Sequence, residues 1–183
     1  MTETNQNEFI AAIRPPSAAE LTEFFRLALK EKTRVIVLIV ENSPEIDESF
    51  YESLKNSEIP VILALKFSAV EKLVDACHLC VAASAAEIGD VSAAAALKSG
   101  LINKIANSEQ VETEAFALAE KISQLAPLAI RASLKAVTDG LNSSLEEGLK
   151  IETDLFSQIF STADMREGTR AFLEKRKPIF YGK

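Results

Sequence analysis

Residues 34–40 read RVIVLIV, a run in which only the first residue is polar and most of the others are β-branched. Such a run is typical of a strand that is buried on both faces, as in a parallel sheet covered by helices. Apolar runs at residues 61–65 and 79–83 predict two more buried strands. These strands indicate a sheet at the centre of the fold.

Segments with helical spacing lie before and between these strands. A capping box at Ser17 and Glu20 predicts a helix that runs to about residue 32. Because strands and helices alternate, the first part of the chain belongs to the α/β class. The other predicted elements of this part are helices at residues 47–55, 68–77 and 92–99 and a short strand at residues 101–105.

The pattern changes after residue 106, where no further strand signal occurs. Ser144 and Glu147 form a second capping box at the start of one of the later helices. The four predicted helices cover residues 109–125, 128–139, 145–160 and 163–175. We therefore predict a flexible N-terminus at residues 1–16, a reduced α/β core at residues 17–106, and an all-helical C-terminal region at residues 107–183.

Composition excludes several classes of protein. The chain has 183 residues, a net charge of -7 and a pI near 4.9, which argues against a nucleic-acid partner because such partners require a basic face. The longest apolar run is far too short to span a bilayer, which argues against a membrane partner. The polar N-terminus shows no secretory signal, and two cysteines cannot form a disulfide framework. We expect a cytoplasmic protein.

Cys77, His78 and Cys80 form the one cluster with possible metal or redox chemistry. A thioredoxin-like pair requires a helix N-terminus, whereas these residues lie where a helix ends and an apolar strand begins. A zinc site would need a fourth ligand. We therefore predict core cysteines, a surface or capped histidine, and neither a metal site nor a cofactor.

Phosphate-binding loops are absent, because no two of the six glycines lie close enough for such a motif. A cationic cluster near the C-terminus is the remaining candidate for binding an anion. By spacing alone it reads as a solvated tail with favourable charges at a helix C-terminus, and a grip on an anionic ligand is the alternative. Its members are Arg170, Lys175, Arg176, Lys177 and Lys183.

Several segments resemble motifs of the crotonase (enoyl-CoA hydratase/isomerase) superfamily. The sequence SAAAALKSGLIN at residues 92–103 and DMREGTRAFLEKRKP at residues 164–178 resemble two of its C-terminal motifs. ACHLCVA at residues 76–82 resembles a third, with His78 and Cys80 in place of Asp and Arg. The resemblance implies a crotonase-like ββα spiral core, here reduced, with a helical C-terminal region.

The resemblance is weakest where the family places its catalytic groups. In the family, two backbone N–H groups form an oxyanion hole for a thioester enolate, and glycines allow the close approach. The corresponding loops here, ENSPE at residues 41–45 and KFSAV at residues 66–70, are short and lack glycine. The stretch that carries the hydratase carboxylates is largely missing, and no motif assigns Glu87 or Asp90 to that role.

These losses predict a shortened, degenerate member of the superfamily without catalytic residues, acting as a structural or binding protein. The alternative is an active acyl-CoA hydratase, isomerase or decarboxylase with a rearranged site. A third reading is a helical interaction module with no relation to CoA.

The resemblance further implies two substrate-binding residues, Phe172 and Lys175, which lie against the adenine and phosphates of CoA in the family. We expect weak binding of CoA esters and a homo-oligomer, either a trimer or a hexamer. A physical argument supports assembly, because residues 145–160 carry apolar side chains at spacings of three and four that a small α/β layer has little surface to cover.

Overall fold

The computed structural model describes residues 2–4, 9–14, 23, 25–29, 32–41 and 46–183. The chain divides into two compact units, Met1–Ile122 and Ser123–Lys183, and each is described by itself. The predicted boundary between core and C-terminal region lay at residue 106. The units divide later because helix α5 (Val111–Ser123) buries Val111, Ala115 and Ala119 in the core of the first unit.

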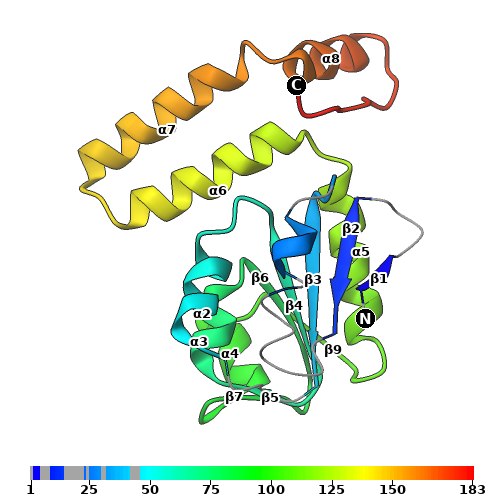
Figure 1. The fold of residues 1–183 in the computed structure, drawn as a ribbon, viewed down its shortest axis with the longest axis vertical. Helices are drawn as coiled ribbons and strands as arrows, with labels where there is room; N and C mark the ends of the chain where they lie inside the picture. The colour runs from blue at the N-terminus through cyan, green and yellow to red at the C-terminus, as the bar shows by residue number, and fades with distance from the viewer. Residues whose placement is uncertain (1, 5–8, 15–22, 24, 30–31, 42–45) are drawn as a thin grey trace. The chain divides into compact units, whose positions relative to one another are not determined.

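A six-stranded sheet forms the centre of the first unit among the residues that the structure describes (Figure 1). Its order is β1-β2-β3-β4-β6-β9, and all neighbours are parallel except β1 and β2. The strands are β1 (Thr2–Thr4), β2 (Ile10–Ile13), β3 (Val35–Val40), β4 (Val61–Leu65), β6 (Leu79–Ala83) and β9 (Lys104–Ala106).

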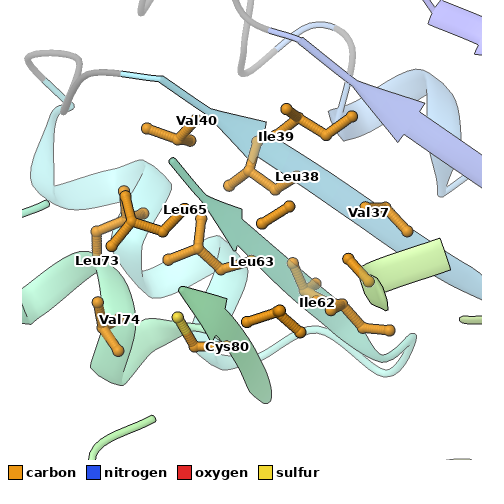
Figure 2. Packing of buried hydrophobic residues seen from close by; sticks show 14 of the residues in the cluster. Val37, Leu38, Ile39, Val40, Ile62, Leu63, Leu65, Leu73, Val74 and Cys80 are labelled. Carbon is orange, nitrogen blue, oxygen red and sulfur yellow. The ribbon is translucent and has the colours of Figure 1, made fainter. Parts of the chain in front are cut away.

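Strands β3 and β4 are buried along their whole length, as their apolar runs predict. Leu38 lies opposite Leu63 in the parallel register, and Leu63 lies opposite Cys80 of β6. Figure 2 shows these side chains packed together with Leu73 and Val74 of the neighbouring helix α3 (Glu71–Ala76). The sheet therefore needs helices on both faces, and α2 (Glu48–Lys55), α3 and α4 (Ala93–Ser99) lie on one side of it and α5 on the other (Figure 1).

A small second sheet explains why the predicted helix at residues 68–77 begins late. Ser68 and Ala69 form β5, which pairs with β7 (Glu87–Ile88), and β7 pairs with β8 (Val91–Ser92). Strands of two residues have no period that a sequence can display, so the tertiary pairing determines them.

The N-terminus differs from the flexible segment predicted at residues 1–16. Ile10, Ala12 and Ile13 are buried, and β2 pairs in parallel with β3. The run IAAI is too short to predict a strand, and it forms one because it pairs with β1 on one side and β3 on the other. The predicted capping box at Ser17 and Glu20 lies outside the described residues.

The second unit consists of three helices in the described residues: α6 (Pro127–Leu141), α7 (Leu145–Ile159) and α8 (Ala163–Leu173). The predicted capping box is confirmed, because the Ser144 side chain accepts from the Glu147 N–H and the Glu147 side chain accepts from the Ser144 N–H. Helices α6 and α7 approach each other closely at two glycines, where a Cβ on Gly148 would lie 3.5 Å from the Gly140 Cα. Neither helix contains a buried residue.

The segment after α8 folds back onto the start of that helix. The buried Asp164 carboxylate accepts hydrogen bonds from the N–H groups of Tyr181 and Gly182, each at 2.8 Å. The Lys183 carbonyl accepts from the N–H groups of Ala163 and Asp164. The chain between residues 163 and 183 therefore forms a closed loop that holds residues 174–183 in place. In the part of the chain that is described, no helix is long and apolar enough to cross a membrane.

Candidate functional site

Charged residues follow three neighbouring strands at the carboxyl edge of the large sheet. Arg14 follows β2, Glu41 follows β3 and Lys66 follows β4, each directly after the last residue of its strand. Because the strands are parallel and adjacent, these residues lie along one edge. This edge is where open α/β sheets bind their ligands.

Glu112, in the first turn of α5, joins two of these residues. Arg14 forms a forked contact with it: Nη1 donates to Oε1 at 3.2 Å and Nη2 to Oε2 at 2.5 Å. The Lys66 Nζ lies 2.6 Å from the same Oε1 and 3.4 Å from Glu41 Oε1. We refer to Arg14, Glu41, Lys66 and Glu112 as the edge row.

The contacts within the edge row favour the charged forms of Lys66 and Glu112. Hydrogen bonding to Glu112 raises the pKa of Lys66 above its ordinary value. Burial tends to raise the pKa of Glu112, but hydrogen bonds from Lys66 and Arg14 outweigh burial and hold that pKa below its usual range. The four residues therefore form a network of two cations and two anions.

The loop after β4 is bound into the fold by its own backbone. The Lys66 N–H donates to the Val40 carbonyl at 3.1 Å, so this amide is already used inside the sheet. The Phe67 and Ala69 carbonyls accept from the N–H groups of Glu87 and Gly89. The Glu87 and Asp90 side chains are exposed. Among the contacts of the described residues, neither side chain has an acid–base partner.

Cys80 is buried in β6 within the core, whereas Cys77 and His78 are partly buried in the turn before that strand. Burial raises the pKa of both thiols, that of Cys80 to about 12, which makes them inert. The His78 Nδ1 accepts from the Val61 N–H at 3.0 Å, and burial lowers the pKa of the imidazole. Within the described residues, no group of His, Cys, Asp and Glu is arranged to hold a metal ion.

Phe172 and Lys175 lie at the C-terminal end of α8. The Lys175 N–H donates to the Phe172 carbonyl and the Arg176 N–H to the Ala171 carbonyl, which is the Schellman pattern. Lys175 occupies its left-handed position with φ +56°, where glycine is usual. Phe172 is 83% exposed, so its ring is largely uncovered by the residues that the structure describes.

One member of the predicted cationic cluster, Arg176, forms ion pairs within the second unit. Arg176 contacts Glu167 and Glu174, each at 2.6 Å, and hydrogen bonding to Arg176 lowers the pKa of Glu167 to about 2. The Ile179 N–H also donates to Glu167. Arg176 therefore fixes the segment after α8 rather than facing a ligand.

An apolar groove of about 460 Å³ runs between α6 and α7. Small residues of α6, among them Ala132, Ala136 and Gly140, form one wall. Leu149 and Phe156 of α7 line it too and are 55% and 60% exposed. Within the second unit, this face is apolar and its large side chains are exposed.

The edge row is the feature that sequence reasoning missed. A signal existed, because Arg14, Glu41 and Lys66 each end an apolar run. Nothing in the sequence pairs them with Glu112, which lies 98 residues from Arg14. The buried role of Asp164 was missed in the same way, although its segment was recognised as a motif.

Comparisons with known proteins agree with this geometry. The enoyl-CoA hydratase/isomerase family model matches residues 82–183. A probable enoyl-CoA hydratase of Mycobacterium tuberculosis is 43% identical over 90 residues, which are 49% of this chain and 35% of that protein. The crotonyl-CoA hydratase of Syntrophomonas wolfei is 37% identical over 93 residues, 51% of this chain and 36% of that one. The sequence match therefore spans about a third of the length of these relatives.

Solved structures extend the likeness to the whole fold. An enoyl-CoA hydratase from Bacillus anthracis has a TM-score of 0.83 and 21% identity, and the match covers 98% of each chain. Human enoyl-coenzyme A hydratase domain-containing protein 3 has a TM-score of 0.83 and 19% identity, with 98% of this chain and 99% of that chain covered. These matches confirm the predicted crotonase-like α/β fold with a helical C-terminal region. Because the family model matches more than half of the chain, the chain belongs to the enoyl-CoA hydratase/isomerase family.

Proposed function

We propose that this chain is a non-catalytic member of its family that acts through assembly, with a residual, weak affinity for CoA esters. The observation that carries the proposal is the edge row. Where the family's catalytic amides follow the strands, this chain has two short loops without glycine and a network of charges that satisfy one another.

The chemistry of the edge row supports the absence of hydratase activity. An oxyanion hole requires backbone N–H groups that point at the developing charge, and loss of one such donor reduces the rate roughly a hundred- to a thousand-fold. The Lys66 N–H already donates to Val40, and the Lys66 and Arg14 side chains are engaged by Glu112. Glu87 and Asp90 are exposed and give no acid–base pair.

The second unit supports the assembly part of the proposal. Leu141, Leu145, Leu149, Phe156 and Phe160 are all more than half exposed, and α6 and α7 contain no buried residue. A monomer rarely exposes so many large apolar side chains on one hairpin. We expect this face to be covered by further copies of the chain in a trimer or a hexamer, with closed symmetry.

Residual binding of CoA esters rests on Phe172 and Lys175. One exposed ring and one exposed cation provide a stacking surface and a charge, which together suffice for about millimolar affinity. We assign no cofactor to the protein.

Hydration of crotonyl-CoA by the purified chain tests the catalytic part, with the crotonyl-CoA hydratase of Syntrophomonas wolfei assayed in parallel. We expect no turnover above the uncatalysed rate. Turnover within tenfold of the control enzyme would overturn the proposal in favour of an active acyl-CoA hydratase, isomerase or decarboxylase with a rearranged site.

Light scattering and an NMR titration with CoA test the other two parts. We expect a particle of three or six chains of 19.9 kDa, whereas a monodisperse monomer at tens of micromolar would contradict assembly. In the titration, Phe172→Ala should abolish the shifts, and Leu97→Ala, which removes an exposed apolar side chain on α4, should leave them unchanged. Micromolar affinity, or shifts that Phe172→Ala does not alter, would contradict the weak site.

A further inference from the structure

Three nitrogen atoms of the edge row, two from Arg14 and one from Lys66, converge on the Glu112 carboxylate. The two outer nitrogens of the Arg14 guanidinium contact the two oxygens of Glu112, and the Lys66 ammonium contacts one of them. The Lys66 and Glu112 side chains are 23% and 19% exposed, so the contact is largely shielded from water. A fork combined with an ammonium group is the donor set with which proteins bind carboxylate ligands.

The cations and the carboxylate come from different parts of the fold. The sheet supplies Arg14 and Lys66, at the ends of β2 and β4, whereas helix α5 supplies Glu112. The carboxyl edge of a parallel sheet is where open α/β folds bind their ligands. Glu112 also lies in the first turn of α5, where the helix dipole favours a negative charge.

We propose that Glu112 is a built-in ligand that occupies an anion site formed by Arg14 and Lys66, and that this site accepts a small carboxylate from solution when the Glu112 carboxylate is absent. This inference rests on the proposed function, which places the closed site at the carboxyl edge of the sheet. It deepens that proposal by naming Glu112 as the group that fills the site. The charges select the class of ligand: with Glu41 present 3.4 Å from Lys66, one further negative charge balances the two cations. A monoanionic carboxylate therefore fits the site.

Chemical rescue tests the inference. Glu112→Ala should lower the melting temperature, because it leaves two cations at a shielded position without their main partner. Sodium formate at 100 mM should then raise the melting temperature of this variant by about 2–4 °C more than sodium chloride at equal ionic strength. The unaltered protein should show no difference between the two salts, since its site is already filled.

Two control variants identify where formate acts. Glu114→Ala removes the carboxylate that contacts Lys104 at 2.6 Å on the same helix, outside the edge row, and should show no formate-specific rise. The double variant Glu112→Ala, Lys66→Ala should lose the rescue. If Glu112→Ala gives no cooperative transition, Glu112→Gln provides the test through an NMR titration with formate, in which the Lys66 and Arg14 side-chain signals should shift.

Several outcomes would overturn the inference. Equal effects of formate and chloride on Glu112→Ala, or no shift of the Lys66 and Arg14 signals in Glu112→Gln, would show that the site does not accept a carboxylate. Rescue that persists in the double variant would place the effect elsewhere. The hydration assay uses the unaltered protein, so failure of the rescue and failure of the proposed function can be distinguished.

Discussion

The carboxyl edge of the sheet and the α6–α7 hairpin differ in whether their side chains find partners. At the edge, Arg14 and Lys66 both pair with Glu112, and the loop after β4 is bound into the small sheet through Ser68 and Ala69. On the hairpin, large apolar side chains such as Leu149 and Phe156 remain exposed. The comparison teaches that the charged side chains at the end of the sheet are paired within the fold, whereas the large apolar side chains of the hairpin remain exposed.

The largest expected effect contrasts a leucine of the core with one of the hairpin. Leu63→Ala creates a cavity among fully buried neighbours and should lower the free energy of unfolding by about 2–5 kcal/mol. Leu149→Ala should change it by less than about 0.5 kcal/mol in the dissociated chain, because the side chain is 55% exposed. Denaturant titration measures both values. A loss of stability in the dissociated Leu149→Ala chain as large as that in Leu63→Ala would mean that the hairpin is a core rather than an interface.

A second prediction concerns the pH dependence of the edge row. The folded-state pKa of Glu112 lies below the ordinary 4.5, so its stabilising effect is present above about pH 4.5 and is lost as the pH falls through the folded value. The folded-state pKa of Lys66 lies above the ordinary 10.5, so its effect is lost as the pH rises through the folded value. Glu112→Gln should cost about 1–3 kcal/mol at neutral pH.

Unfolding measured from pH 2 to pH 8 checks this effect. In Glu112→Gln the loss of stability below pH 4.5 should be smaller than in the unaltered protein. Glu114→Gln serves as the matched control, because its partner Lys104 is more exposed than Lys66. Identical acid limbs in Glu112→Gln and the unaltered protein would show that the edge row contributes nothing to closing the site.

A third prediction uses His78, whose Nδ1 accepts from Val61 at the start of β4. Protonation removes this acceptor, and the folded-state pKa lies below the ordinary 6.5. Stability should therefore fall as the pH decreases below about 6.5 and level off below the folded pKa, with a total loss of about 1 kcal/mol. His78→Gln, which keeps an acceptor but does not titrate, should remove this step. A step that persists in the variant would assign it to another group.

The smallest expected effect lies at the C-terminal end of α8. Lys175→Gly relieves the left-handed conformation at φ +56° and should stabilise the second unit by at most about 1 kcal/mol, measured by thermal unfolding. The same change removes a cation of the proposed CoA contact, so the NMR shifts with CoA should weaken. Unchanged CoA binding in this variant would leave Phe172 as the only contributor to that contact.

Much of the fold could be predicted from local patterns. Strands β4 and β6 have the predicted bounds, residues 61–65 and 79–83. A strand buried on both faces has a continuous apolar sequence, which is easy to recognise. The helix at residues 93–99 begins after its Ser92 cap. It ends at Gly100, whose φ of +83° is a conformation that favours glycine. The absence of glycine at residues 41–45 and 66–70 was also visible, since a missing residue type needs no tertiary information.

Only the tertiary structure decided the rest. Strand β2 is a strand because β3 lies beside it, and the two-residue strands β5, β7 and β8 exist only through their pairing with one another. Arg14 and Glu112 lie 98 residues apart in the chain, and no local period relates two charges at that distance. The sequence alone determines where the chain is apolar and where it turns, because these properties depend on near neighbours. Which charges meet at the end of the sheet depends on the order and direction of its strands, and this order exists only once the chain has folded.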